Sequence, residues 1–183
     1  MAKIYGFSVK SLKSFKDHEG ITCYSGNLYL KNKKIGTWSQ DYMAGPDHFD
    51  LIRPFTEQEL DGKIEKLHPA FDAGDEKLTG YNLELLMCDL VKLTLDEKRF
   101  KKALKEGYIG ILIVSDGWHE LCWKLSANMS GRAKEEILDE MEKEIEAEKQ
   151  KARFFRETRG KRHETFLYLC PDDFVIGEDL EMQ

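Results

Sequence analysis

The chain has 183 residues, of which 41% are hydrophobic and 34% are charged, and its formal net charge is −6. This composition excludes a disordered chain, because it supplies enough apolar surface for one domain or two small ones. The net negative charge disfavours general coating of nucleic acid, which draws on net positive charge. No apolar run approaches the roughly 20 residues of a membrane span, so we expect a cytoplasmic protein with no membrane contact.

Residues 1–54 are predicted to form an antiparallel β module. Apolar and polar residues alternate in residues 4–9, which places Tyr5, Phe7 and Val9 on one face of a strand. Residues 22–31 alternate as well, and a polar turn at Asn32 joins them to a third strand. After a loop that contains Gly45-Pro46, residues 48–53 form a further short strand.

Residues 55–107 are predicted to be helical. Thr56 and Glu59 have the spacing of a capping box, which predicts a helix that begins at Thr56 and stops at Pro69. A second helix is expected over residues 82–93. Thr94 and Glu97 repeat the capping-box spacing and predict the start of a third helix, which ends at Gly107.

Residues 108–183 are predicted to form a β-β-α-β arrangement. Asp116-Gly117 is the preferred pair for a two-residue type I′ turn, and the strand before it is nearly all apolar and therefore central. A long helix follows over roughly residues 132–159, and residues 165–170 form the last strand. The whole chain is therefore expected to be an α+β protein, and the sequence leaves open whether its two sheet regions are separate domains.

The long helix is divided by charge. Residues 135–148 hold eight acids and one lysine, whereas residues 149–162 hold seven bases and one acid. Three interpretations remain open: complementation of the helix dipole, a homodimer of two antiparallel helices, and a nucleic-acid or acidic-partner patch. The candidate patch consists of the bases Arg153, Arg156, Arg159, Lys161 and Arg162.

The segment between the third and fourth strands gathers aromatic and ionisable residues. Its candidate partner-binding residues are Trp38, Asp41, Tyr42, Asp47 and His48. A divalent metal site is disfavoured here, because Asp47 lies beyond the start of the strand that carries His48 and no second ligand motif supports it. A simple strand connection and a partner-binding loop remain, the latter because aromatics on a short loop suit an interface.

Chemical motifs are otherwise absent from the sequence. The four cysteines, Cys23, Cys88, Cys122 and Cys170, are too far apart for a CxxC pair and are expected to be reduced core residues. Zinc-protease HExxH, nucleophile-elbow GxSxG, P-loop and GxGxxG patterns are all missing, so no catalytic residue, metal or cofactor is predicted.

Residues 3–51 combine a strand, the pair Glu19-Gly20, the segment NLYLKNKKIG and a polar loop with Gly45-Pro46. This run resembles the N-terminal module of small uncharacterised proteins encoded by phages and integrative elements of Gram-positive bacteria. In size, acidity and lack of a catalytic signature the chain is also similar to anti-CRISPR proteins that inhibit type II RNA-guided nucleases. That similarity implies action by binding a nuclease or its guide-RNA complex.

The prediction is therefore a non-enzymatic accessory or inhibitory protein of a mobile element that binds a macromolecular partner. The alternative is an RNA- or DNA-binding protein, or an RNA-processing nuclease, that uses the basic end of the long helix.

Overall fold

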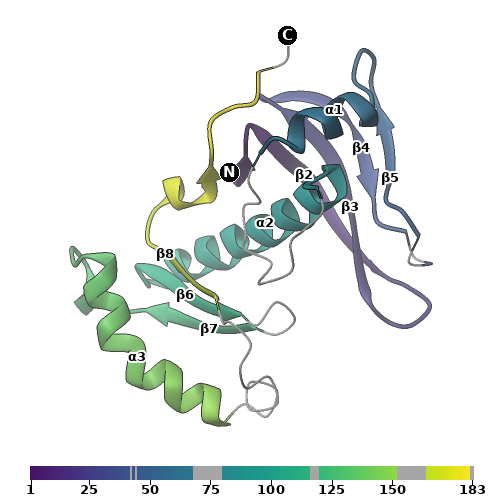
Figure 1. The fold of residues 1–183 in the computed structure, drawn as a ribbon. Coiled ribbons are helices and arrows are strands. Elements are labelled where there is room, and N and C mark those ends of the chain that lie inside the picture. The colour runs from purple at the N-terminus through teal and green to yellow at the C-terminus, as the bar shows by residue number, and fades with distance from the viewer. Residues whose placement is uncertain (42, 44, 68–79, 116–119, 152–163, 182–183) are drawn as a thin grey trace. The chain divides into compact units, whose positions relative to one another are not determined.

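The computed structural model describes residues 1–41, 43, 45–67, 80–115, 120–151 and 164–181 (Figure 1). The chain divides into two compact units: unit 1 comprises Met1–Glu97 and Phe174–Gln183, and unit 2 comprises Lys98–Asp173. The chain thus leaves unit 1, forms unit 2 and returns. The α+β class is confirmed, whereas the predicted boundaries at residues 54 and 107 do not coincide with the boundaries of these units.

Unit 1 contains a six-stranded sheet in the order β5-β4-β3-β2-β1-β9. Its first five strands pair in an antiparallel manner, as the N-terminal pattern predicts, and β9 pairs in parallel with β1. The strands are β1 (Lys3–Ile4), β2 (Phe7–Lys16), β3 (Thr22–Leu30), β4 (Lys33–Ser39), β5 (His48–Leu51) and β9 (Val175–Ile176).

Two tight turns set the register of this sheet. Lys31 and Asn32 both have positive φ and close the β3–β4 hairpin, which confirms the turn predicted at Asn32. Tyr5 and Gly6, at φ 51° and 83°, close the β1–β2 hairpin in the same way. The prediction that Tyr5 shares a strand face with Phe7 is therefore wrong, because Gly6 lets the chain turn between them.

A β-bulge interrupts β2 between Lys10 and Lys13, and Ser11 there has φ 55°. Gly26 on β3 lies close to this bulge. A Cβ at Gly26 would stand 2.7 Å from Cγ2 of Val9 and 3.1 Å from the carbonyl oxygen of Lys10. The close approach of the two strands therefore requires glycine at this position.

Helix α1 (Glu57–Ile64) begins as predicted. The Oγ1 of Thr56 accepts a hydrogen bond from the backbone N–H of Glu59 at 3.3 Å, which satisfies one of the free donors of the first turn. Figure 1 shows α1 and the first half of α2 against one face of the sheet. Phe7, Leu28, Ile35, Leu60 and Leu86 are fully buried in the core of this unit.

Helix α2 (Leu83–Lys105) is one continuous helix, so the predicted break with a second capping box at Thr94 is wrong. Its start is capped instead by Asp61 and Asn82, which accept from the N–H groups of Leu83 at 2.7 Å and Leu85 at 2.9 Å. Glu97 is buried, and its carboxylate accepts from the N–H of Ala2. The local pattern assigns the Glu97 side chain to a helix cap, but this side chain bonds instead to Ala2, a residue distant in the sequence.

The C-terminal segment belongs to the core of unit 1. Phe174 is fully buried, and β9 follows it alongside β1. The N–H of Leu180 donates to the carbonyl of Tyr5 at 2.9 Å, and Nζ of Lys63 donates to the carbonyl of Glu181 at 3.2 Å. These contacts hold the acidic C-terminal residues against the first hairpin and helix α1.

Unit 2 contains a three-stranded sheet in the order β7-β6-β8, so the apolar strand is central as predicted. Its elements are β6 (Gly110–Ser115), β7 (Glu120–Leu125), the 3-10 turn η1 (Ala127–Met129), α3 (Lys134–Lys151) and β8 (Glu164–Tyr168). The 3-10 turn η2 (Pro171–Phe174) crosses the boundary between Asp173 of unit 2 and Phe174 of unit 1. The predicted turn at Asp116-Gly117 lies outside the described residues. The ladder pairs Ser115 with Glu120, which is not the register that a two-residue turn at those positions produces.

One apolar face of α3 packs on this sheet. Ile137, Met141 and Ile145 are buried with Leu112 and Val114 of β6 in a single core cluster. The described part of the predicted long helix ends at Lys151, and the rest of that prediction falls outside the described residues.

The cysteines differ in part from the prediction. None of the four forms a disulfide bond; Cys23 is buried as expected, whereas Cys88, Cys122 and Cys170 are exposed. On α2 the neighbours Leu86, Met87 and Leu90 face the core and leave Cys88 outside, which corrects its assignment as a core residue.

Candidate functional site

A hollow of about 730 Å³ opens on unit 1 across strands β2 to β5, with Glu57 of α1 at its border. We call this hollow the polar groove, because hydroxyl, amide and ionisable side chains form most of its lining. The lining residues are Ser11, Lys13, Ser25, Gly26, Asn27, Thr37, Trp38, Ser39, Asp47, His48, Phe49, Asp50 and Glu57.

The strand register explains why polar side chains meet there. Cross-strand partners lie on the same face of a sheet, and two successive rows of partners are polar in all four strands. One row is Lys13, Ser25, Ser39 and His48; the other is Lys10, Asn27, Thr37 and Asp50. Leu28 and Trp38, which alternate with these residues, are buried on the opposite face. The groove is thus the polar side of an amphipathic sheet.

A chain of hydrogen bonds fixes the border of the groove at the start of β5. The indole Nε1 of Trp38 donates to Oδ2 of Asp47 at 2.7 Å, and the backbone N–H of Asp47 donates to Oε1 of Glu84 at 2.8 Å. Strand β4, the loop before β5 and helix α2 are thereby tied together. Trp38 is only 2% exposed, so its ring supports the groove from below.

Asp47 is a half-buried carboxylate. Burial raises its pKa, the hydrogen bond from Trp38 opposes this, and the negative charge of Glu84 raises the pKa further. Neither Asp47 nor Glu84 forms an ion pair with a lysine or arginine in the part of the chain that the structure describes. The groove border therefore has negative charge that a cation from outside would stabilise.

The loop between β4 and β5 is organised by Asp41. Its carboxylate accepts from the N–H groups of Met43 at 2.9 Å and Gly45 at 3.1 Å. A Cβ on Gly45 would lie 2.2 Å from Oδ2 of Asp41, so a larger residue there would displace this carboxylate from its present position. Asp41 therefore shapes this loop through its own backbone.

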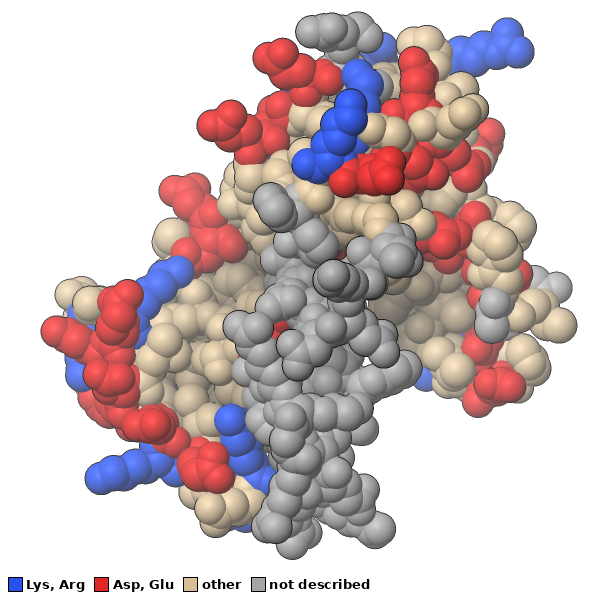
Figure 2. Space-filling model, in the orientation of Figure 1, with Lys and Arg blue, Asp and Glu red and all other residues tan. Residues whose placement is uncertain are grey.

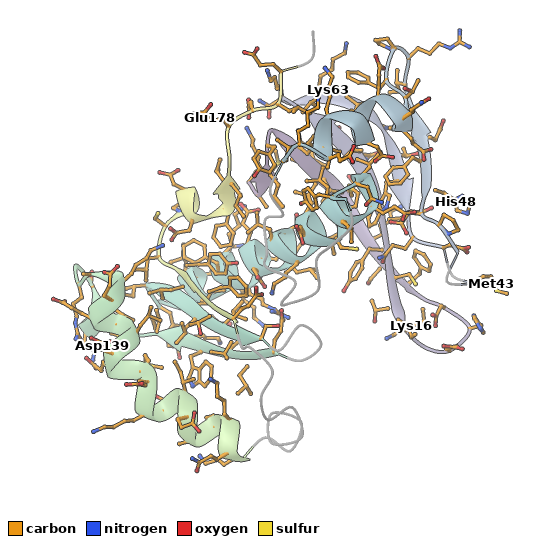
Figure 3. The ribbon with its side chains drawn as sticks, in the orientation of Figure 1. Lys16, Met43, His48, Lys63, Asp139 and Glu178 are labelled. Carbon is orange, nitrogen blue, oxygen red and sulfur yellow. The ribbon has the colours of Figure 1, made fainter. Side chains whose placement is uncertain are left out.

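The five predicted partner-binding residues divide into three groups. Asp47 and His48 line the polar groove, and Figure 3 shows His48 and Met43 pointing outward from the same flank. Trp38 also lines the groove but is only 2% exposed, and the carboxylate of Asp41 accepts from loop amides; partner binding by these two residues stays a prediction. Tyr42 lies outside the described residues. Partner binding by Asp47 and His48 stays a prediction.

The remaining groove residues are missing from the sequence prediction. Ser25, Asn27, Thr37 and Ser39 stand at alternate positions of two neighbouring strands, and this period-two polarity is the signal that identifies them. Lys13 and Asp50 become neighbours of these residues only because the register of the four strands aligns Lys13 with Ser25 and Asp50 with Thr37. No local motif marks such a row.

The basic patch of Arg153, Arg156, Arg159, Lys161 and Arg162 lies outside the described residues, so its binding role and the helix dimer stay predictions. The described part of the helix carries the acidic half, and Figure 2 shows acidic side chains along α3. Several of these acids are paired locally, such as Glu140 with Arg132 and Glu148 with Lys151.

The described residues contain no group of three or more histidine, cysteine or acidic side chains that could hold a metal ion. Among the helices that the structure describes, none has the length and apolar character to cross a membrane. Comparison of the chain with protein-family models, curated proteins and solved structures finds no match.

Proposed function

We propose that this chain acts by binding, and that a protein partner docks on the polar groove of unit 1. The observation that carries the proposal is the bond chain from Trp38 through Asp47 to Glu84, which holds the groove border in place without a ligand. A preformed surface loses little conformational entropy on binding, which favours specific association. Hydroxyl and amide side chains supply both donors and acceptors for such a partner.

The narrower form of the proposal is an accessory or inhibitory protein of a phage or other mobile element. Its support is the resemblance carried by residues 3–51, the segment that supplies strands β2 to β5 and thus nearly all of the groove. The anti-CRISPR likeness makes a type II RNA-guided nuclease, with its guide RNA, the first partner to test.

The experiment incubates the full chain with such a nuclease and its guide, and separately with labelled RNA and DNA in the presence and absence of magnesium. Inhibition of target cleavage, with no cleavage of nucleic acid by the chain alone, supports the proposal. Cleavage of RNA or DNA by the purified chain alone contradicts it and supports the alternative, a nuclease that uses the basic end of the long helix.

A further inference from the structure

Strand β5 is the edge of the six-stranded sheet. The N–H of Ile52 donates to the carbonyl of Ile35 at 2.8 Å, and this bond sets the phase of the ladder with β4. Hydrogen-bonded pairs alternate with non-bonded pairs in an antiparallel ladder, so Asp50 bonds to Thr37 while the backbone groups of Phe49 and Leu51 point away from β4. In the described part of the chain nothing bonds to these outward N–H and C=O groups.

The side chains around this edge have two characters. Asp50 and His48 are exposed on the groove side, whereas Phe49 and Leu51 are half-buried on the core side. Ile52, directly after the strand, is 50% exposed. A strand added beside β5 would place alternate residues next to polar and apolar neighbours.

The charged side chains of the groove beside β5 are mainly acidic. Asp47, Asp50 and Glu57 line the groove together with one lysine, Lys13, and none of these three acids pairs with a described base. Figure 2 shows acidic side chains on the flank where β5 runs. Opposite charges on facing strands attract, so a basic strand complements this edge better than a neutral or acidic one.

A second copy of the chain fits this edge less well. Two antiparallel β5 strands use all the outward groups of Phe49 and Leu51 only in the register that is centred on Asp50. That register places the two Asp50 carboxylates directly opposite each other, where like charges repel.

We propose that β5 accepts an extended basic segment of a partner protein as an added antiparallel strand. This inference rests on the proposed binding function. The partner segment would form backbone hydrogen bonds with Phe49 and Leu51 and direct its basic side chains toward Asp50. Guest residues opposite Phe49 and Leu51 direct their own N–H groups at β5. Guest residues opposite Asp50 direct theirs away from it.

The probe is a capped peptide of about nine alternating lysine and valine residues, titrated into the isotope-labelled full chain and followed by NMR. We expect shifts at the amides of Phe49 and Leu51 and slower solvent exchange of both. In the favoured alignment, lysine faces Asp50 and valine faces Phe49 and Leu51. N-methylation of the valine amides therefore abolishes binding, whereas N-methylation of the lysine amides leaves it within about twofold.

Charge is tested separately. The same peptide with glutamate in place of lysine should not bind, and Asp50→Lys should weaken the lysine peptide about tenfold or more. Glu65→Lys, an exposed change directly after α1 and outside the groove, is the matched control and should leave affinity unchanged. Equal effects of the two methylation patterns, or shifts that avoid Phe49 and Leu51, would overturn the proposal.

Two further outcomes separate the alternatives. Concentration-dependent shifts at Phe49 and Leu51 without peptide would assign the edge to a second copy and overturn the basic-peptide proposal. If Thr37→Arg loses nuclease binding while the wild-type chain does not bind the peptide, the proposed docking function stands. That result rejects only the added strand at β5.

Discussion

The buried indole of Trp38 donates a 2.7 Å hydrogen bond to the half-buried carboxylate of Asp47 at the border of the polar groove. This contact joins β4, which forms part of the groove floor, to the residue directly before the edge strand β5. Trp38→Phe keeps most of the apolar packing and removes only this donor. We expect it to lower the free energy of unfolding by about 1–2 kcal/mol, measured by urea denaturation. An unchanged free energy would mean that the bond does not hold the groove border.

The pH dependence of stability tests the charge at Asp47. Burial raises its pKa in the folded state above the ordinary 3.8, so the folded protein binds the proton more tightly than the unfolded chain. Its ionised form therefore opposes folding at neutral pH, and this penalty disappears as the pH falls through the raised pKa. We expect wild type to gain stability relative to Asp47→Asn as the pH is lowered toward 3.8. A difference in unfolding free energy between the two proteins that stays constant with pH would show that the pKa of Asp47 is not raised by folding.

Asp173 in unit 2 should show the opposite dependence. Burial raises its pKa, but hydrogen bonds from Nζ of Lys134 and from the N–H groups of Leu169 and Cys170 outweigh this and hold the pKa below its ordinary value. Its stabilising effect is complete above the unfolded-state pKa and is lost as the pH falls through the lowered one.

Asp173→Asn should therefore cost about 1–2 kcal/mol of unfolding free energy at neutral pH. The difference from wild type should shrink in acid, as followed by thermal melts at several pH values. Equal stabilities at neutral pH would show that these hydrogen bonds are not stabilising on balance.

Gly26 tests the bulge that shapes the groove floor. A Cβ there would meet Val9 at 2.7 Å, so Gly26→Ala should destabilise the protein by about 1–3 kcal/mol. Gly62, inside α1 with nothing within 4 Å of an added Cβ, is the matched control. Gly62→Ala should stabilise by about 0.5–1 kcal/mol, because alanine favours a helix. Calorimetric melts that rank the two variants the other way would refute the packing argument.

Phe174 tests the return of the chain to unit 1. Its ring is fully buried, and Phe174→Ala should lower the free energy of unfolding by about 3–5 kcal/mol. Val175, the next residue, is 50% exposed, and its change to alanine should have little effect. Hydrogen exchange at β1 should accelerate only in the Phe174 variant. Identical exchange in both variants would mean that the C-terminal segment is not part of the core.

Local patterns in the sequence predict the elements that depend on near neighbours. Alternation indicates the strands of unit 1, and the capping box at Thr56 marks the start of α1 because both partners lie within one turn. The same pattern at Thr94 fails, since Glu97 accepts a hydrogen bond from Ala2, which is 95 residues away in the sequence. A cap signal alone does not reveal a competing partner that is distant in sequence.

The candidate site depends even more on distant pairing. Trp38 and Asp47 stand in the segment that the sequence singles out, yet only the β4–β5 register shows that one supports the other. The row that includes Asn27, Thr37 and Asp50 forms only where three strands align, so the polarity along any one strand is an incomplete guide to the site.

The central claim is that the polar groove is a docking surface for a protein partner. Its most direct test is the affinity of that partner, beginning with the nuclease–guide complex, for two arginine variants of the same sheet. Thr37 lies in the groove and Ser14 does not, although both are exposed on neighbouring parts of the sheet. We predict that Thr37→Arg weakens binding at least about tenfold and that Ser14→Arg leaves it unchanged. Equal affinities of the two variants for a partner that binds wild type would contradict the claim.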